Sequence, residues 1–507
     1  MTTAAPPSLV QRHPKVDAFL SQSPIKLFID NEFVPSASGE TFEVLNPADE
    51  SILATVSRGA KEDIDRAVKA ARANFESGAY HRLSVHERGK LMYKLADAIE
   101  DNLEVFAQLE SLDNGKPIAV ARAADIPLAI EHFRYYAGWA DKITGEVIPV
   151  SPPYAPGQRF LNYALREPIG VVGQIIPWNF PLLMAAWKLG AALACGCSIV
   201  LKPAEQTPLS AMKLAELVAE VGFPAGTLNV IPGFGDAGAR LAEHPDVDKV
   251  AFTGSTEVGK KIVQASAGNL KRVTLELGGK SPNVVFADAD LEIAAQGAAS
   301  AIFFNHGQCC CAGSRLFVED KVYDELVERV AAIGESIKLG PGMAEDTQMG
   351  PLVSKEQLDR VLGYIDAGKA EGAAVRTGGD RPNGNLSKGY FCKPTVFDKV
   401  NSNMKIIREE IFGPVVAAMP FSDLDQLAKE ANNSEYGLAA GIYTNDVGKA
   451  HRTAEAIRAG SVWVNCYNMF DAASPFGGYK QSGNGREMGK YALDNYTEIK
   501  SVWIRTE

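Results

Sequence analysis

The sequence predicts an α/β protein that consists of two α/β units and a small additional β element. Within residues 170–276, short apolar runs bounded by Gly or Pro alternate with helical segments, as in a parallel sheet wrapped by helices. A second series of the same kind lies within residues 281–482. These runs hardly alternate with polar residues, which is typical of strands covered on both faces. Two segments, 158–166 and 496–505, do alternate, and we expect strands that pair with each other or with another subunit.

The size and charge of the chain exclude several classes of protein. A chain of 507 residues can form two to four domains or subdomains, and the region from Asp63 to Leu112 shows helical apolar spacing. The net charge of −11 argues against nucleic-acid binding, because no basic surplus is available to neutralise phosphates. No apolar run is long enough to predict a membrane span, and the N-terminus lacks the apolar core of a secretory signal. We expect residues 1–24 to form a disordered arm.

The cysteines favour a reducing compartment. There are seven, an odd number, and three of them are consecutive, Cys309 to Cys311, which makes a poor disulfide framework. We therefore expect a cytoplasmic protein. Three adjacent cysteines without a second Cys or His pair also argue against a metal site. They are either small buried apolar residues or one reactive thiolate whose neighbours shape a pocket, and a thiolate needs a helix N-terminus or a positive charge to lower its pKa. His306 is close in sequence but stands in no catalytic pattern.

Two glycine-rich turns compete as a phosphate-binding loop. GFGDAG (233–238) and FTGSTEVG (252–259) each follow an expected strand and open an expected helix. Backbone N–H groups at such a helix start can bind a dinucleotide phosphate, but either turn can equally be a tight strand-to-helix connection. The local sequence leaves the choice open.

An apolar helix face follows an asparagine in the segment PWNFPLLMAAWKLG (177–190). Phe180, Leu183, Met184 and Trp187 have the spacing of one helix face, for which burial in a core is the ordinary interpretation. Asn179 stands before this helix, where its side-chain amide could stabilise an oxyanion at the mouth of an apolar groove.

The ordered motifs of the chain resemble the aldehyde dehydrogenase superfamily, and closely its broad-specificity, NAD-dependent, usually tetrameric branch. The resemblance runs from about Leu27 to Val502, and seven motifs carry it: IIPWNFP, LKPAEQTP, FTGSTEVG, LELGGKSP, FNHGQCCCAGSR, EEIFGPV and SPFGGYKQSG. It implies a Rossmann-type NAD-binding domain, an α/β catalytic domain and a small β oligomerisation element. The expected bounds are 25–149 with 167–278 for the first, 279–482 for the second, and 150–166 with 483–507 for the third.

The resemblance also implies the catalytic residues. Cys310 matches the nucleophile, Glu276 the general base, and Asn179 the oxyanion-hole amide, which acts together with the backbone N–H of Cys310. Without the resemblance, Glu276 is an ordinary surface glutamate at a strand end. The expected reaction converts an aldehyde into a carboxylic acid through a thiohemiacetal and a thioester on Cys310.

The family pattern supplies a set of cofactor residues. Lys202 and Glu205 match contacts to the adenosine ribose, and a carboxylate there favours NAD over NADP because it repels a 2′-phosphate. Glu410 matches the contact to the nicotinamide ribose, and FTGSTEVG becomes the pyrophosphate turn. The expected cofactor residues are Ile175, Trp178, Lys202, Glu205, Gly235, Gly254, Ser255, Thr256, Gly259, Glu410 and Phe412.

The expected substrate tunnel is apolar and no Arg or Lys matches a carboxylate clamp, so we expect uncharged aliphatic or aromatic aldehydes of medium size. Its expected wall residues are Leu128, Phe180, Leu183, Met184, Trp187, Cys309, Cys311, Phe470 and Phe476. Three other functions stay open: a CoA-acylating dehydrogenase, a catalytically silent protein on the same fold, and a thiol hydrolase. Glu276 argues against the CoA-acylating dehydrogenase, which usually lacks this base. The complete catalytic set argues against a silent protein, and the lack of a partner His argues against a thiol hydrolase. The family pattern implies a homotetramer, with a dimer as the alternative.

Overall fold

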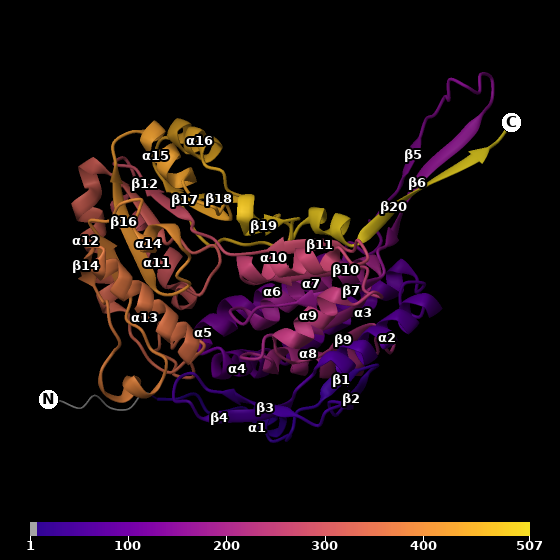
Figure 1. Ribbon diagram of the computed structural model, residues 1–507, viewed down its shortest axis with the longest axis horizontal. Helices are drawn as coiled ribbons and strands as arrows, with labels where there is room; N and C mark the ends of the chain where they lie inside the picture. Colours follow the sequence, from indigo (N-terminus) through magenta and orange to yellow (C-terminus); the bar gives the residue numbers. More distant parts are fainter. Residues whose placement is uncertain (1–7) are drawn as a thin grey trace.

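The computed structural model describes residues 8–507 and contains two α/β bodies, with a β arm that projects from the first body (Figure 1). The first body is built on an eight-stranded sheet in the order β19-β11-β10-β7-β8-β9-β1-β2. Its five central strands are parallel, as predicted from residues 170–276, and antiparallel strands extend both edges. The parallel strands are β7 (Val171–Ile175), β8 (Ser198–Lys202), β9 (Leu228–Val230), β10 (Lys249–Thr253) and β11 (Arg272–Glu276). The edge strands are β1 (Leu27–Ile29), β2 (Glu32–Val34) and β19 (Gly483–Asn484).

Helices cover both faces of this sheet. The helix α7 (Pro181–Cys195) is apolar on all sides because every residue in it is buried between the sheet and its neighbouring helices. Pro181 stands at its first turn, where a missing N–H costs no hydrogen bond. The helices on the α7 face are α3 (Val85–Asp101), α4 (Leu103–Asp113), α6 (Ile126–Ala137) and α8 (Leu209–Val221). The helices on the other face are α2 (Lys61–Ser77), α9 (Gly235–Glu243) and α10 (Thr256–Ser266). A small sheet of β3 (Thr41–Leu45) and β4 (Ile52–Ser57) lies beside this body.

The second body repeats the parallel architecture with seven strands in the order β14-β15-β16-β13-β12-β17-β18. Six parallel strands lie within residues 281–482, where the sequence predicts a second series of strands, and β14 adds an antiparallel edge that the sequence did not indicate. The strands are β12 (Pro282–Val285), β13 (Arg315–Glu319), β14 (Ala374–Thr377), β15 (Thr395–Asp398), β16 (Val415–Phe421), β17 (Ala439–Tyr443) and β18 (Ser461–Val464). The helices are α11 (Leu291–Phe303), α12 (Tyr323–Ser336), α13 (Lys355–Ala370), α14 (Lys405–Arg408), α15 (Leu424–Asn432) and α16 (Val447–Ala456).

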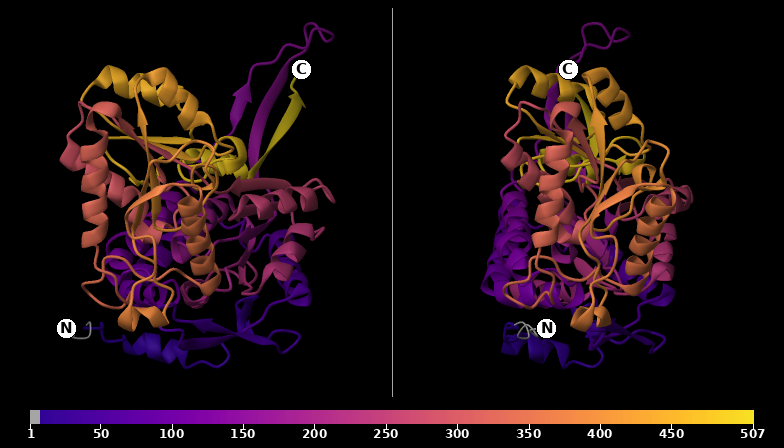
Figure 2. Two further views of the ribbon diagram at one scale, coloured as in Figure 1. Left: turned by 60° about the vertical axis from the view of Figure 1, so that its left-hand side comes forward. Right: turned by 90° about the vertical axis from the view of Figure 1, so that its left-hand side faces the viewer.

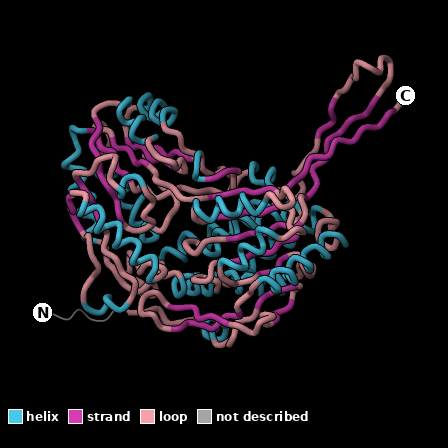
Figure 3. The backbone as a smooth tube through the Cα atoms, in the orientation of Figure 1, coloured by secondary structure: helices cyan, strands magenta, loops and turns pink. Residues whose placement is uncertain are grey.

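The projecting arm is a three-stranded antiparallel sheet, in which the two isolated strands expected from the sequence pair with each other (Figure 3). It contains β5 (Glu146–Ile148), β6 (Phe160–Pro168) and β20 (Thr497–Arg505). The expected bounds of this element therefore need correction at two places. The arm already includes β5, and residues 483–496 do not belong to it, because β19 pairs with β11 and the 3₁₀ helix η6 (Lys490–Asn495) packs on α7.

The expectation of a disordered N-terminal arm is wrong for the described part of residues 8–24. The helix α1 (Pro14–Leu20) forms at the base of the first body (Figure 2), and Val16 and Phe19 are buried. His13 caps the helix by accepting a hydrogen bond from the N–H of Lys15. A helix this short is marginal in water, so packing against α4 is what stabilises it. Residues 1–7 lie outside the described part of the chain.

Candidate active site

One cavity of about 570 Å³ receives side chains from both bodies. Asn179 stands just before α7, and Glu276 is the last residue of β11. Cys310 lies in the loop between the 3₁₀ turn η2 (Phe304–Gly307) and β13. All three line the cavity, at the carboxyl ends of the parallel strands β10 and β11, where open α/β sheets place their ligands. The fold thus brings together the three residues expected to be catalytic, which are far apart in sequence.

The three cysteines have different environments. Cys310 is half-buried, whereas Cys309 and Cys311 are buried on either side of it, with their Sγ atoms 3.4 Å apart. The hydroxyl of Tyr467 donates a 2.7 Å hydrogen bond to the carbonyl of Cys311. Gly279 lets the chain pass closely behind the loop, since a Cβ at that position would lie 2.4 Å from the carbonyl oxygen of Cys310. The loop therefore presents Cys310 as the accessible sulfur of the three.

The thiols modify one another's acidity. Hydrogen bonds from Cys310 and Cys311 hold the pKa of the Cys309 thiol well below its usual range. Hydrogen bonding with Cys309, together with burial, raises the pKa values of Cys310 and Cys311. The S–H groups of the cluster thus favour the ionisation of one sulfur and oppose a second ionisation. Adjacent S–H donors are therefore a source of thiolate stabilisation that the sequence did not indicate.

Glu276 is buried, with an exposed fraction of 5%, and its Oε2 atom has no hydrogen-bond partner among the described residues. Burial raises its pKa well above the ordinary value, the negative charge of Glu487 raises it further, and Lys188 opposes the shift. Gly477 provides the room for the carboxylate, because a Cβ there would lie 2.8 Å from Oε1. The surface-glutamate interpretation is thus wrong for this residue, and a buried carboxyl of raised pKa is suited to accept a proton.

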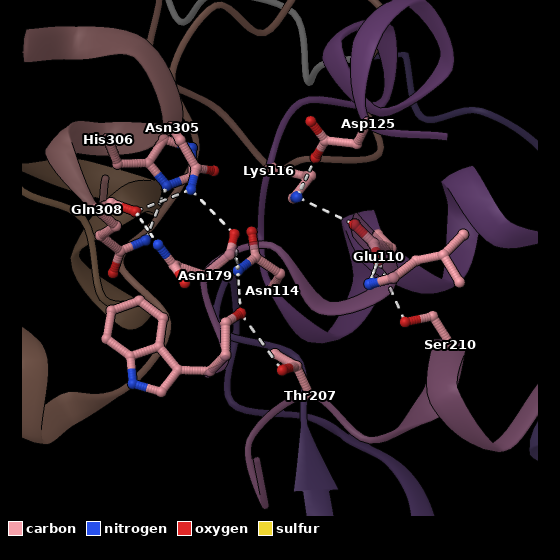
Figure 4. Close-up of polar contacts among 12 residues, drawn as sticks. Glu110, Asn114, Lys116, Asp125, Asn179, Thr207, Ser210, Asn305, His306 and Gln308 are labelled. Carbon is pink, nitrogen blue, oxygen red and sulfur yellow. Dashed lines mark hydrogen bonds and ion pairs between the residues drawn. The ribbon is translucent and has the colours of Figure 1, made fainter. Parts of the chain in front are cut away.

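Asn179 is also buried, with an exposed fraction of 4%. Its Nδ2 atom donates to the carbonyl of Gln308, 3.0 Å away, and its own carbonyl accepts from the Nδ2 atom of Asn305 at 3.0 Å (Figure 4). An amide nitrogen carries two N–H groups, so one remains for a ligand in the cavity.

Three aromatic rings pack together in the wall of the cavity. The ring of Trp187 meets that of Phe476 at 5.2 Å and that of Phe470 at 6.0 Å, and Phe470 and Phe476 are 5.7 Å apart. Aromatic rings at these separations pack favourably and remain rigid. The cavity is lined by every residue expected for the tunnel: Leu128, Phe180, Leu183, Met184, Trp187, Cys309, Cys311, Phe470 and Phe476.

The residues expected to bind the cofactor divide into two sets. Those that line the cavity are Trp178, Gly254, Ser255, Glu410 and Phe412. Those that lie outside it are Ile175, Lys202, Glu205, Gly235, Thr256 and Gly259. Of the two glycine turns, therefore, FTGSTEVG reaches the cavity and GFGDAG does not.

The five that line the cavity include an aromatic pair and a buried carboxyl. The rings of Trp178 and Phe412 lie 5.2 Å apart, edge to face. Glu410 accepts a 2.9 Å hydrogen bond from the N–H of Gly279, and burial raises the pKa of Glu410 to about 7. Ser255 is the N-cap of α10, and its hydroxyl accepts from the N–H of Val258. The positive end of this helix is thus directed at the cavity, where an anionic group would be stabilised.

Comparison with known proteins agrees with this geometry. Residues 33–502 match the family model described as "Aldehyde dehydrogenase family". The chain is 59% identical to the Bacillus subtilis protein DhaS, over 97% of this chain and 98% of that protein. It is 51% identical to the mitochondrial aldehyde dehydrogenase of Homo sapiens, over 95% and 92%. The NAD⁺ complex of an aldehyde dehydrogenase from Bacillus cereus is 56% identical, with a TM-score of 0.96 over 99% of this chain and 100% of that chain.

The chain belongs to the aldehyde dehydrogenase family. The family resemblance and the fold class expected from the sequence are therefore confirmed. With them, the enzyme class is confirmed as that of an aldehyde dehydrogenase that uses NAD.

Several cavity residues were not expected from the sequence. Asp125 lines the cavity and ends a five-residue π-helix, η1 (Ala121–Asp125), a rare form that is frequent at functional sites. Asp125 stands three residues before Leu128, an expected tunnel residue, and this helical spacing could have indicated its position. Tyr467 and Arg360 also line the cavity, and Arg360 donates to the carbonyl of Glu410 rather than to another side chain. Nothing in their local sequence indicates this position, because Tyr467 comes from the loop after β18 and Arg360 from the helix α13.

Within residues 8–507, no helix is long and apolar enough to cross a membrane. In the same part of the chain, no group of three or more His, Cys, Asp or Glu side chains is arranged to hold a metal ion.

Proposed function

We propose that this enzyme oxidises uncharged, medium-size aliphatic or aromatic aldehydes to carboxylic acids through a thioester on Cys310. The observation that carries the proposal is the shared cavity. Cys310, Glu276 and Asn179 line it together, and its remaining wall is mostly aliphatic and aromatic. One nucleophile, one buried base and one amide donor are the groups that this chemistry needs.

In the proposed reaction, the sulfur of Cys310 attacks the aldehyde carbon and the carbonyl oxygen becomes an oxyanion. The free N–H of Asn179 and the backbone N–H of Cys310 stabilise that charge, and one such donor contributes about 3 kcal/mol. NAD, when bound, accepts the hydride that leaves the substrate carbon. Glu276 then takes a proton from water, whose oxygen attacks the thioester; the carbon–sulfur bond breaks, and the acid and the Cys310 thiolate are released.

The residues expected to bind the cofactor fit NAD. Lys202 and Glu205 form an ion pair of 3.5 Å, and Gly238 in the turn GFGDAG approaches the Lys202 side chain closely enough for a Cβ to lie 3.6 Å away. This supports a contact of Lys202 and Glu205 with the adenosine ribose, Ser255 with the pyrophosphate, and Glu410 with the nicotinamide ribose. The Glu205 carboxylate repels a 2′-phosphate, so NADP is the poorer cofactor.

The charges around the tunnel support uncharged substrates. Asp125, which lines the cavity together with Leu128, is paired with the buried Lys116. Among the described residues that line the cavity, Arg360 is the one Lys or Arg side chain, and it donates to the carbonyl of Glu410, which we expect at the nicotinamide ribose. A substrate carboxylate beside the aromatic wall would therefore be buried without a dedicated partner, which is costly. A panel of aldehydes followed by NADH absorbance tests this. Hexanal or benzaldehyde should give a kcat/KM well above that of succinate semialdehyde, and the reverse order would contradict the proposal. Product analysis with and without CoA separates release by water from release by CoA.

For assembly we propose a homotetramer that forms through the arm. Val147, Ile499 and Trp503 on the arm are 74%, 66% and 52% exposed, an unusual density of apolar side chains on a free sheet. Light scattering of the purified enzyme should give the mass of four chains, and the mass of a single chain would contradict the assembly.

For the location we propose the cytoplasm. Seven free cysteines support a reducing compartment of this kind.

A further inference from the structure

Asn305 joins the nucleophile loop to the segment that carries Asn179. The side chain is buried, and its Nδ2 atom donates to the backbone carbonyl of Asn179 at 3.0 Å and to that of Gln308 at 3.1 Å (Figure 4). Asn179 belongs to the first body, whereas Gln308 stands two residues before Cys310. One amide group therefore contacts the backbone of both chain segments and helps to fix their separation.

The same carbonyl of Gln308 also orients the Asn179 side chain. It accepts from the Asn179 Nδ2 atom at 3.0 Å, so the amides of Asn179 and Asn305 share one acceptor. With one N–H of the Asn179 amide held in this way, the direction of the other N–H is determined. On the far side, Asn114 donates to the carbonyls of Trp178 at 2.9 Å and Asn179 at 3.4 Å.

The backbone at Asn305 explains why an asparagine stands there. Its φ of 46° and ψ of 36° lie in the left-handed region, which asparagine adopts more readily than most residues. His306 and Gly307 continue the left-handed turn, and the N–H of Gln308 closes it by donating to the carbonyl of Asn305 at 2.9 Å. This turn directs the Asn305 amide at Asn179 and leads the chain on to Cys310.

We infer that Asn305 is a positioning residue for the oxidation: it holds the Asn179 amide at the correct place relative to the Cys310 sulfur. The inference rests on the proposed role of Asn179 as the oxyanion donor. Asn305 does not line the cavity, so it acts through Asn179 and not on the substrate. A donor displaced by about 1 Å can reduce a reaction rate by about 100-fold.

A double-mutant cycle on the full-length enzyme tests this. Asn305→Gly keeps the left-handed backbone and removes the amide, and it should lower the rate of the first NADH burst by about 10- to 100-fold, with little change in KM. Asn179→Ala should lower it by about 100- to 1000-fold. If Asn305 acts through Asn179, the double variant should be no more than about threefold slower than Asn179→Ala.

A matched control separates positioning from general stability. Asn31 also has a left-handed backbone, with φ of 61°, and its Nδ2 atom donates to the carbonyl of Phe223 at 2.7 Å, outside the cavity. Asn31→Gly should leave the burst rate unchanged. If Asn305→Gly does not fold, Asn305→Asp, which keeps the shape but loses both donors, takes its place in the cycle.

Two results would overturn the inference. One is a double variant whose loss is the product of the two single losses; the other is an Asn305 variant that reacts as fast as the Asn31 control. A fast Asn179→Ala enzyme would instead refute the proposed role of Asn179, so the two failures are distinguishable.

Discussion

Lys116 is the residue whose replacement has the clearest consequence for stability. Its ammonium group is fully buried, 3.0 Å from the Glu110 carboxylate, and it also pairs with Asp125. It lies 4.9 Å from the centre of the Phe180 ring. Glu110 in turn accepts a hydrogen bond from the N–H of Leu182 in the first turn of α7. Lys116→Met keeps the length of the side chain but leaves two buried carboxylates without a counter-charge.

The size of the effect follows from this burial. Removing one partner of a buried ion pair costs about 3–5 kcal/mol, because the remaining charge is desolvated. Burial already raises the pKa of Asp125 to about 6, against the pull of Lys116, so the pKa must be higher still in the variant. A carboxyl with a raised pKa in the folded state contributes stability at low pH that is lost as the pH rises through that pKa. The deficit of the variant should therefore be small at pH 5.5 and reach about 3–5 kcal/mol at pH 8.

Urea unfolding at both pH values measures this, at one protein concentration because the enzyme is proposed to be an oligomer. The control is Lys94→Met on α3, where the lysine is exposed and takes part in no ion pair among the described residues. The control should match the wild type. A Lys116→Met enzyme that is as stable as the wild type at pH 8, or equally destabilised at both pH values, would refute the reasoning.

Three further outcomes are expected. Phe470→Ala should raise KM for a small aliphatic aldehyde by about 10-fold and shift kcat/KM towards bulkier substrates, because one ring of the wall is lost; a substrate panel shows this. Glu205→Gln should raise kcat/KM for NADP relative to NAD by about 10-fold, measured with saturating aldehyde, since the charge that repels the 2′-phosphate is removed. The raised pKa of Glu276 predicts that kcat falls as the pH decreases through a value well above the ordinary glutamate pKa; a profile flat down to pH 5 would contradict this.

Local sequence pattern predicted the parts of the fold that depend on local chemistry. The parallel strands are short apolar runs between Gly and Pro residues, and each of these runs formed a strand because both of its faces are covered. The helix α1 was missed although Val16, Phe19 and Leu20 have helical spacing, because a seven-residue helix depends on a partner that the local sequence does not reveal. The edge strand β14 likewise depends on its pairing with β15, which the local sequence does not reveal.

The family pattern predicted the residues of the active site. The pKa shifts of these residues could not be predicted from the sequence. A glutamate at a strand end is ordinarily exposed, and it is burial, together with the nearby charge of Glu487, that raises the pKa of Glu276. Likewise, the three cysteines are evident in the sequence, but which sulfur is accessible depends on how the loop folds. The position of Asp125 at the cavity was missed because it depends on a π-helical turn and on a buried lysine.

The most direct test of the account is the identity of the acylated residue. Glu276→Gln should still form the thioester but hydrolyse it slowly, because a general base contributes about 100- to 10,000-fold. After this variant is mixed with benzaldehyde and NAD and quenched in acid, mass spectrometry of the peptide should show one acyl group on Cys310, with one NADH formed per active subunit. An acyl group on Cys309 or Cys311, or unimpaired turnover without any adduct, would contradict the account.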